Sequence, residues 1–123
     1  MTYCFDLDGT LCTDTQGSYD KAAPFPEMVA EVNRLHAQGH HVIIYTARGS
    51  GTGIDWRAVT ERQLSEWGVA YDFLYLGKPP ADVYVDDKAV HVSGFRLACL
   101  GHLDPADKPA VFPPFPGERE KSA

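Results

Sequence analysis

The stretch of sequence that decides the fold lies near the start of the chain and reads Tyr3-Cys4-Phe5-Asp6-Leu7-Asp8-Gly9-Thr10-Leu11. Its first three residues are of the aromatic and apolar types that buried strands favour. Gly9 is expected to end this strand, because glycine adopts a left-handed or strained turn at little cost. Asp6 and Asp8 are therefore predicted to lie at the carboxyl end of a buried strand, where open α/β sheets bind their ligands.

The two carboxylates of this stretch are only one residue apart. Like charges this close repel each other strongly unless a cation neutralises them. Mg²⁺ is a hard divalent ion that prefers oxygen ligands, so it is the natural partner for Asp6 and Asp8. On these residues alone, an acidic turn that merely follows a strand stays open as the alternative interpretation.

Length and composition limit the class of protein. The chain has 123 residues, which is enough for one small domain. Its net charge of −6 argues against a nucleic-acid surface and suits a protein that gathers carboxylates around a cation. No apolar run approaches the ~20 residues of a membrane span, and the first residues show no signal-peptide pattern. Three cysteines without metal-ligand spacing favour a reduced, cytoplasmic setting, and Cys4 is expected to be a small buried hydrophobe.

Helical periodicity predicts two helices. The first covers Pro26–Gln38, with a proline in its first turn and Gly39 directly after it. The second begins at Asp55, which is a good N-cap, and runs to Trp67. Its predicted apolar face consists of Trp56, Val59, Leu64 and Trp67.

Apolar runs predict the strands of the fold. Buried strands are expected at residues 2–6, 40–46 and 82–87. Residues 71–76 are expected to be extended and to form a short or irregular edge strand. The reason is that only Lys78 to Asp82 connect them to the next strand, which leaves no room for a crossover helix. Residues 89–100 form either a short helix or a last strand.

The remaining segments set the domain organisation. Residues 12–25 are predicted to be a long loop, and loops of this length in compact domains are usually functional. Prolines beyond Gly101 indicate an extended or disordered tail over residues 101–123. We therefore expect residues 1–100 to form an α/β domain with a small Rossmann-like parallel sheet flanked by helices.

The hexapeptide from Asp6 to Leu11 resembles the signature of the haloacid dehalogenase (HAD) superfamily of phosphotransferases, Asp-x-Asp-Gly-Thr-Leu. Three further motifs follow in the order that this superfamily has, namely Thr46 after the second strand, the basic residue Lys78, and the acidic pair Asp86-Asp87. In the superfamily, any inserted cap begins where residues 12–25 lie, and this segment is far too short for a folded cap. The resemblance thus implies a HAD-like domain with no separate cap domain.

The resemblance also implies catalytic roles, each of which has a physical reason. Asp6 is the expected nucleophile, whose carboxylate forms an aspartyl-phosphate and divides one hard displacement into two easier steps. Asp8 is the expected general acid and then general base. Thr46 is expected to hydrogen-bond a phosphoryl oxygen, and Lys78 to neutralise Asp6 and the transferred phosphate.

The same resemblance implies a Mg²⁺ site and a phosphate cradle. The expected metal ligands are Asp6, the backbone carbonyl of Asp8, and the acidic pair, in which Asp87 binds the metal directly. Asp86 then holds a metal-bound water or Lys78, and the reverse assignment within the pair stays open. The backbone N–H groups of two residues of the signature are expected to face the phosphate, namely those of Leu7 and Gly9.

A closer resemblance concerns a group of small, cap-less members that are often described as capsule or polysaccharide biosynthesis phosphatases. It covers residues 3–92 and rests on Tyr45-Thr46-Ala47-Arg48-Gly49, Thr52-Gly53-Ile54-Asp55-Trp56, and the segments around Lys78 and Lys88. It implies a phosphosugar substrate. Ala47, Arg48 and Lys88 are the further substrate-binding candidates, and the two basic residues are placed to reach a second charged group. A surface ion pair is the alternative for each of them.

These features together predict a Mg²⁺-dependent phosphomonoesterase for a sugar phosphate in polysaccharide or nucleotide-sugar biosynthesis. Two alternatives stay open, which are a nucleotidase or other small-metabolite phosphatase on the same fold, and a non-catalytic binding module. No nucleic-acid or membrane partner is expected. Because a cap-less site is open to water, we expect homo-oligomers, or the tail crossing a partner subunit, to cover it.

Overall fold

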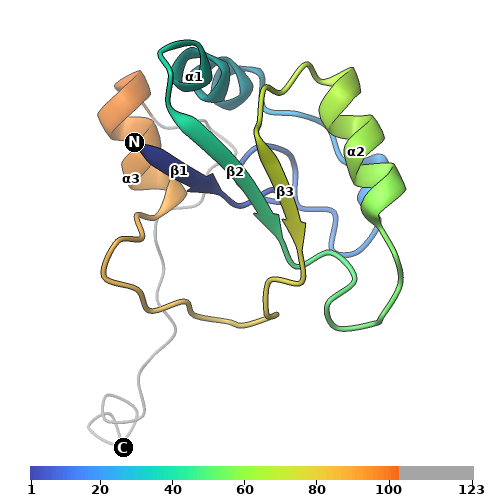
Figure 1. Ribbon diagram of the computed structural model, residues 1–123. Coiled ribbons are helices and arrows are strands. Elements are labelled where there is room, and N and C mark those ends of the chain that lie inside the picture. Colours follow the sequence, from blue (N-terminus) through green and yellow to red (C-terminus); the bar gives the residue numbers. More distant parts are fainter. Residues whose placement is uncertain (103–123) are drawn as a thin grey trace, which may run out of the picture. The chain divides into compact units, whose positions relative to one another are not determined.

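The computed structural model describes residues 1–102 and divides the chain into two units, Met1–Pro80 and a second unit that begins at Ala81. In chain order the first unit contains β1 Thr2–Phe5, the short 3₁₀ helix η1 Tyr19–Lys21, α1 Pro26–Ala37, β2 His41–Thr46, α2 Arg57–Glu66 and β3 Phe73–Leu76 (Figure 1). The second unit contains one helix, α3 Val92–Leu100. The predicted tail lies almost wholly outside the described residues.

The three strands form one parallel sheet in the order β1-β2-β3. Its register places Tyr3 opposite Val42 and Ile44 opposite Leu74. This confirms the predicted α/β fold, a small parallel sheet flanked by helices, and no cap domain is evident between residues 1 and 102. β3 is an edge strand of this sheet, as its short connection to the following segment predicted.

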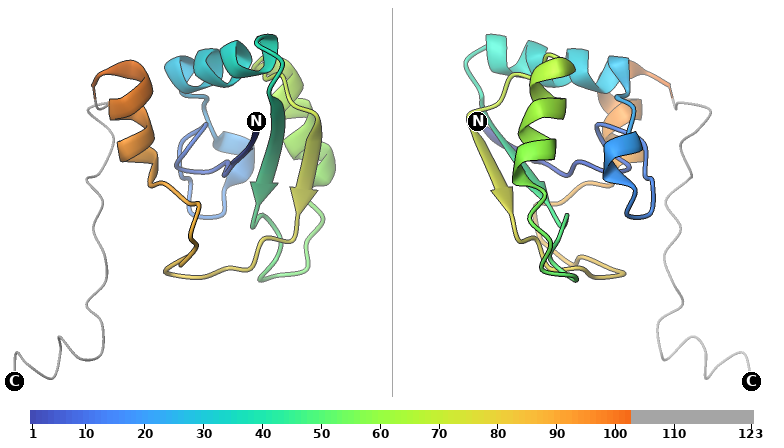
Figure 2. Two further views of the ribbon diagram at one scale, coloured as in Figure 1. Left: turned by 60° about the vertical axis from the view of Figure 1, so that its left-hand side comes forward. Right: turned by 90° about the vertical axis from the view of Figure 1, so that its right-hand side faces the viewer.

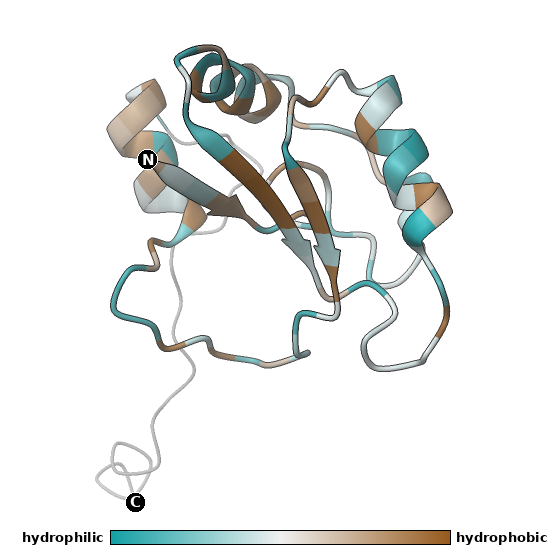
Figure 3. Ribbon diagram, in the orientation of Figure 1, coloured by the Kyte–Doolittle hydropathy of each residue, from teal (hydrophilic) through white to brown (hydrophobic). Residues whose placement is uncertain are grey.

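The core of the first unit covers one face of the sheet. In β2 the side chains of Val42, Ile44 and Thr46 are buried and alternate with half-buried neighbours. Figure 2 shows α1, α2 and η1 on one side of the strands, and Figure 3 shows how apolar the middle of β2 is. α1 buries the stripe Met28, Val29, Val32 and Leu35. Each such side chain contributes roughly 1.5–3 kcal/mol when it is fully buried, so this stripe holds α1 to the sheet.

The predicted apolar face of α2 is turned inward, but it is only partly buried. Leu64 is buried as expected, but Trp56, Val59 and Trp67 are only half-buried. The other buried side chains of α2 are polar, namely Thr60 and Gln63. Both lie on the same face of the helix as Leu64, because residues three and four apart are neighbours on a helix, and both have partners inside the protein, as described below.

The predicted strand over residues 82–87 is wrong. This segment has no regular secondary structure, and local hydrogen bonds from side chains replace a strand ladder. The Asp86 carboxylate accepts the Lys88 backbone N–H at 2.8 Å, and the Tyr84 hydroxyl accepts the Ala81 N–H at 3.2 Å. For residues 89–100 both a helix and a strand were open, and the structure has the helix α3 there. α3 is followed directly by Gly101, which caps it in the left-handed conformation (φ 77°).

Two further observations concern burial and membranes. Cys4 is exposed and not buried as predicted, because it points to the face of the sheet opposite the buried Phe5. Within residues 1–102, no helix has the length and the apolar character that a membrane crossing requires.

Candidate active site at the carboxyl edge of the sheet

The carboxyl ends of the three parallel strands bring the predicted residues of the first unit to one edge of the sheet. A tight turn follows β1, in which the carbonyl of Leu7 accepts the N–H groups of Thr10, Leu11 and Cys12 at 3.1, 2.9 and 3.3 Å. Gly9 has a φ of 84°, which side chains rarely allow. The turn therefore keeps Asp6 and Asp8 together at the end of β1, as the sequence predicted.

Asp6 faces a lysine from the end of β3. The Nζ of Lys78 lies 3.4 Å from Oδ1 of Asp6, and the Thr10 hydroxyl donates to Oδ2 at 3.4 Å. The backbone N–H of Lys78 donates to the carbonyl of Thr46 at 3.1 Å, which fixes the lysine to the end of β2. Burial raises the pKa of the Asp6 carboxyl, and the positive charge of Lys78 opposes that rise. The carboxylate stays partly accessible, with 37% of its side chain exposed.

Asp8 faces an arginine from the end of β2. The Nε and Nη2 atoms of Arg48 donate to Oδ2 and Oδ1 of Asp8, both at 2.9 Å, which is the parallel two-bond geometry that binds carboxylates best. The thiol of Cys12 lies 3.5 Å from Oδ1. Burial raises the pKa of this thiol, so it stays a protonated donor. The two aspartates of the signature thus have different partners.

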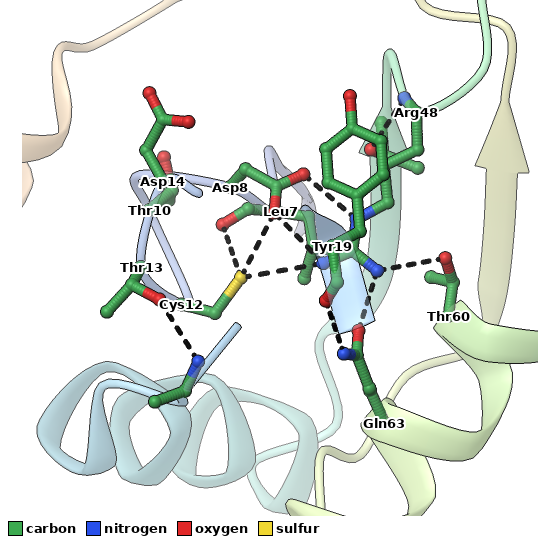
Figure 4. A network of polar contacts seen from close by, with 12 residues as sticks. Leu7, Asp8, Thr10, Cys12, Thr13, Asp14, Tyr19, Arg48, Thr60 and Gln63 are labelled. Atoms are coloured by element: carbon green, nitrogen blue, oxygen red, sulfur yellow. Dashed lines mark hydrogen bonds and ion pairs between the residues drawn. The ribbon is translucent and has the colours of Figure 1, made fainter. Parts of the chain in front are cut away.

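Arg48 is buried at the centre of a polar network (Figure 4), and none of its side chain is exposed. Its Nη1 donates to the Thr60 hydroxyl at 3.1 Å and to Oε1 of Gln63 at 2.6 Å. Its Nη2 also lies 3.9 Å from Sγ of Cys12. With the two bonds to Asp8, these contacts occupy the five N–H groups of the guanidinium. In this structure Arg48 therefore has no N–H group left for a second charged group on a substrate.

The remaining candidates of the first unit lie at the same edge. Thr46 is buried, and its hydroxyl accepts the backbone N–H of Arg48 at 3.2 Å while keeping its own proton to donate. Ala47 is half-buried. The Gly9 N–H, expected to face phosphate, donates to the carbonyl of Cys12 at 2.8 Å. The backbone N–H of Leu7 is turned to the Asp6 carboxylate and lowers its pKa, after the larger effects of burial and Lys78.

The other three candidates belong to the second unit. Asp86, Asp87 and Lys88 are all exposed. The pKa of Asp86 is lowered, first by the hydrogen bond from the Lys88 N–H and then by one with Asp87. Among residues 1–102 no group of three or more His, Cys, Asp and Glu side chains is arranged to hold a metal ion.

The oxygen atoms at the end of β1 have the chemistry that Mg²⁺ requires. Asp6 offers a carboxylate, of which Oδ1 contacts Lys78 and Oδ2 accepts a long bond from Thr10. The carboxylate of Asp8 is held by Arg48, which leaves its backbone carbonyl as the ligand, and no hydrogen bond to that carbonyl occurs among residues 1–102. The predicted use of a side chain from Asp6 and a carbonyl from Asp8 stays a prediction.

Sequence reasoning missed several residues of the network. Cys12, Tyr19, Thr60 and Gln63 carry no motif, and no signal in the sequence pairs them with Arg48. The ring of Tyr19 covers the guanidinium at 4.8 Å and meets the edge of Trp56 at 5.0 Å. Two polar side chains on one face of α2 were the only hint, since a polar residue that faces a core needs a partner there.

Comparisons with known proteins give structural neighbours. No family model and no curated protein matches the chain. The crystal structure of an MCSG target from Vibrio cholerae is 28% identical with a TM-score of 0.69, over 76% of this chain and 85% of that one. A chain in the structure of the Pnkp1/Rnl/Hen1 complex is 23% identical with a TM-score of 0.50, over 79% of this chain. A second structure, of the Pnkp1/Rnl/Hen1 RNA repair complex, is 22% identical with a TM-score of 0.50, over 86% of this chain.

The last two likenesses concern the fold alone, and this chain spans only 33% and 32% of the chains it matches there. The neighbours fit an α/β fold with a Rossmann-like parallel sheet, in agreement with the strands of the first unit.

Proposed function

We propose that this chain is a Mg²⁺-dependent phosphomonoesterase of the HAD superfamily that acts on a sugar phosphate through an aspartyl-phosphate. The observation that carries the proposal is the separate bonding of the two aspartates, with Asp6 beside Lys78 and Asp8 held by Arg48. Two carboxylates in different environments can take the two different roles that ester hydrolysis needs.

In the first step a carboxylate oxygen of Asp6 attacks the phosphorus of the ester. A P–O bond to Asp6 forms while the P–O bond to the sugar breaks, and the electron pair of that bond goes to the sugar oxygen. Asp8 acts as general acid in its protonated form, which takes the place of the carboxylate that Arg48 holds in this structure: it gives its proton to this oxygen, and the alcohol leaves. Lys78 stays beside Asp6, where its positive charge stabilises the charge that develops on the transferred group.

In the second step a water oxygen attacks the phosphorus of the aspartyl-phosphate. Asp8, now ionised, takes a proton from this water, so it returns to its protonated form. The P–O bond to Asp6 breaks, its electron pair returns to the carboxylate, and inorganic phosphate leaves. The Thr46 hydroxyl, which keeps a proton to donate, is the proposed hydrogen-bond partner of a phosphoryl oxygen.

The Asp6 carboxylate and the Asp8 carbonyl would hold Mg²⁺, and Asp86 and Asp87 remain the further ligands predicted from the sequence. When bound, the ion neutralises negative charge on the phosphoryl oxygens. The same proposal includes a phosphosugar as the substrate, a homo-oligomer as the assembly and the cytoplasm as the location of the chain. The motifs and the composition of the sequence support these parts.

The test is phosphate release by the purified chain from 4-nitrophenyl phosphate and from a panel of phosphosugars and mononucleotides, with Mg²⁺ and after exhaustive chelation. We expect release with Mg²⁺, loss after chelation, and the highest kcat/KM on a phosphosugar. Ca²⁺ is expected to substitute poorly, because it tolerates looser coordination. No release from any ester would overturn the proposal in favour of a binding module, and a preference for mononucleotides would assign a nucleotidase.

A further inference from the structure

We propose that Gln63 on α2 is a positioning residue for Asp8 and that it acts through Arg48. This inference rests on the proposed function, because it concerns the second aspartate of the same site. Gln63 belongs to none of the motifs, and only 4% of it is exposed. Both ends of its side-chain amide have partners, each at 2.6 Å.

The chemistry of these partners fixes the orientation of the amide. Arg48 can only donate, so Oε1 of Gln63 must face Nη1, at 2.6 Å. The carbonyl of Tyr19 can only accept, so Nε2 of Gln63 must face it, also at 2.6 Å. A flipped amide would put donor against donor and acceptor against acceptor. The Tyr19 carbonyl therefore holds Gln63 in the one orientation that can anchor Arg48.

Arg48 transmits this anchoring because its guanidinium is one rigid plane. Nη1 is held by Gln63 and Thr60, while Nε and Nη2 of the same plane are bonded to Asp8. The ring of Tyr19 lies over the plane at 4.8 Å and restricts it from one side. A shift of Nη1 thus moves the two N–H groups that set the orientation of the Asp8 carboxyl.

The orientation of Asp8 matters most when the leaving group needs a proton. Phenoxide is a strong base and requires protonation as it leaves, whereas 4-nitrophenoxide spreads its charge onto the nitro group and leaves without it. A poorly oriented general acid therefore slows phenyl phosphate more than 4-nitrophenyl phosphate. A general loss of folded structure slows both equally, so the ratio of the two rates separates positioning from a purely structural role.

The experiment compares kcat/KM on these two esters for the whole chain, with Mg²⁺, in the parent and in Gln63→Met. kcat/KM covers the steps up to departure of the leaving group, so hydrolysis of the aspartyl-phosphate does not hide the effect. We expect a loss of about tenfold or more on phenyl phosphate and less than about threefold on 4-nitrophenyl phosphate, since misplacement by ~1 Å can cost about 100-fold. Gln38→Met, the same substitution at an exposed glutamine that follows α1, is the matched control and should change neither rate.

Thr60→Val provides a second variant, because it removes the other acceptor of Nη1 with little change in shape. Thr60→Val should also lose more kcat/KM on phenyl phosphate than on 4-nitrophenyl phosphate, but to a smaller extent. If thermal unfolding shows that Gln63→Met does not fold, the result for Thr60→Val decides whether the inference holds. Equal losses on both esters, or no loss in a folded variant, would overturn the inference and leave the proposed function standing. A parent chain that is inactive on both esters would overturn the proposed function, and this inference with it.

Discussion

The Nζ atom of Lys78 lies 3.4 Å from Oδ1 of Asp6, and the backbone N–H of the same lysine is bonded to Thr46. One residue thus connects the ends of all three strands, because Asp6 follows β1, Thr46 ends β2 and Lys78 follows β3. The backbone bond fixes the main chain of Lys78 at this edge, and its Nζ already lies beside Asp6, which suits the stabilisation of charge that develops there.

Replacing this cation is the first test. Lys78→Met is expected to lower kcat/KM by about 10²–10³-fold, the range found when one preorganised stabilising group is removed. Lys78→Arg keeps the charge and should retain more of the activity than Lys78→Met. Lys21→Met, at an exposed lysine of η1, is the control and should behave as the parent in the phosphatase assay. Parent-like rates in Lys78→Met would remove Lys78 from the mechanism.

The nucleophile gives the second prediction. Asp6→Asn should lose turnover by several orders of magnitude, because an amide cannot form the aspartyl-phosphate. The variant should nevertheless fold, and without metal it should unfold at a higher temperature than the parent at neutral pH, since burial disfavours the charged form of Asp6. Turnover and thermal unfolding are measured on the same preparation. Retention of more than about a tenth of the parent activity, far above that loss, would exclude the covalent mechanism.

The glycine-rich loop after Arg48 gives the third prediction. Gly49 has a φ of 82°, and a Cβ added to it would lie 2.1 Å from the carbonyl oxygen of Ile54. Gly49→Ala is therefore expected to cost at least about 1–3 kcal/mol of unfolding free energy, the usual cost of one strained residue. Gly51→Ala is the matched control, because Gly51 has no positive φ. A Cβ added to Gly51 would meet no atom within 4 Å beyond its chain neighbours. Denaturant unfolding of the two variants should separate them, and equal stability would contradict the steric argument.

Asp72, at the far end of β3, gives a pH-dependent prediction. Its carboxylate accepts the N–H of Val42 at 2.8 Å, and this bond, followed by the nearby His41 and His36, lowers the pKa of Asp72. Because the pKa is lower in the folded chain, ionised Asp72 stabilises the fold above the ordinary aspartate value of about 4. That contribution is lost as the pH falls through the lowered pKa.

Asp72→Asn should therefore unfold at a lower temperature than the parent at neutral pH. The gap between the two melting temperatures should narrow as the pH falls below about 4, where the parent carboxyl takes up its proton. Asp20→Asn, at an exposed aspartate of η1, is the control. A gap that is constant from neutral to acid pH would show that the charge of Asp72 plays no part.

The sequence by itself determined the parallel α/β arrangement and the edge at which the site lies. The pattern of Tyr3 to Phe5 followed by Asp6 and Asp8 is local, since strand propensity and the turn at Gly9 depend on neighbours in the chain. β2 and α1 were predicted within one residue of their observed ends for the same reason. Lys78 could be placed at this edge because parallel strands have their carboxyl ends side by side.

Only the tertiary structure decided which side chains pair. The apolar residues of α2 predicted its core-facing side, and that side also contains Thr60 and Gln63, which accept hydrogen bonds from the buried Arg48. Periodicity reports the average polarity of a helix face and cannot register a single buried guanidinium from another element. Apolar side chains likewise predicted a strand over residues 82–87, because the pattern of polarity does not show which hydrogen bonds the backbone forms. Local bonds, such as that from the Lys88 N–H to Asp86, formed there in place of a strand ladder.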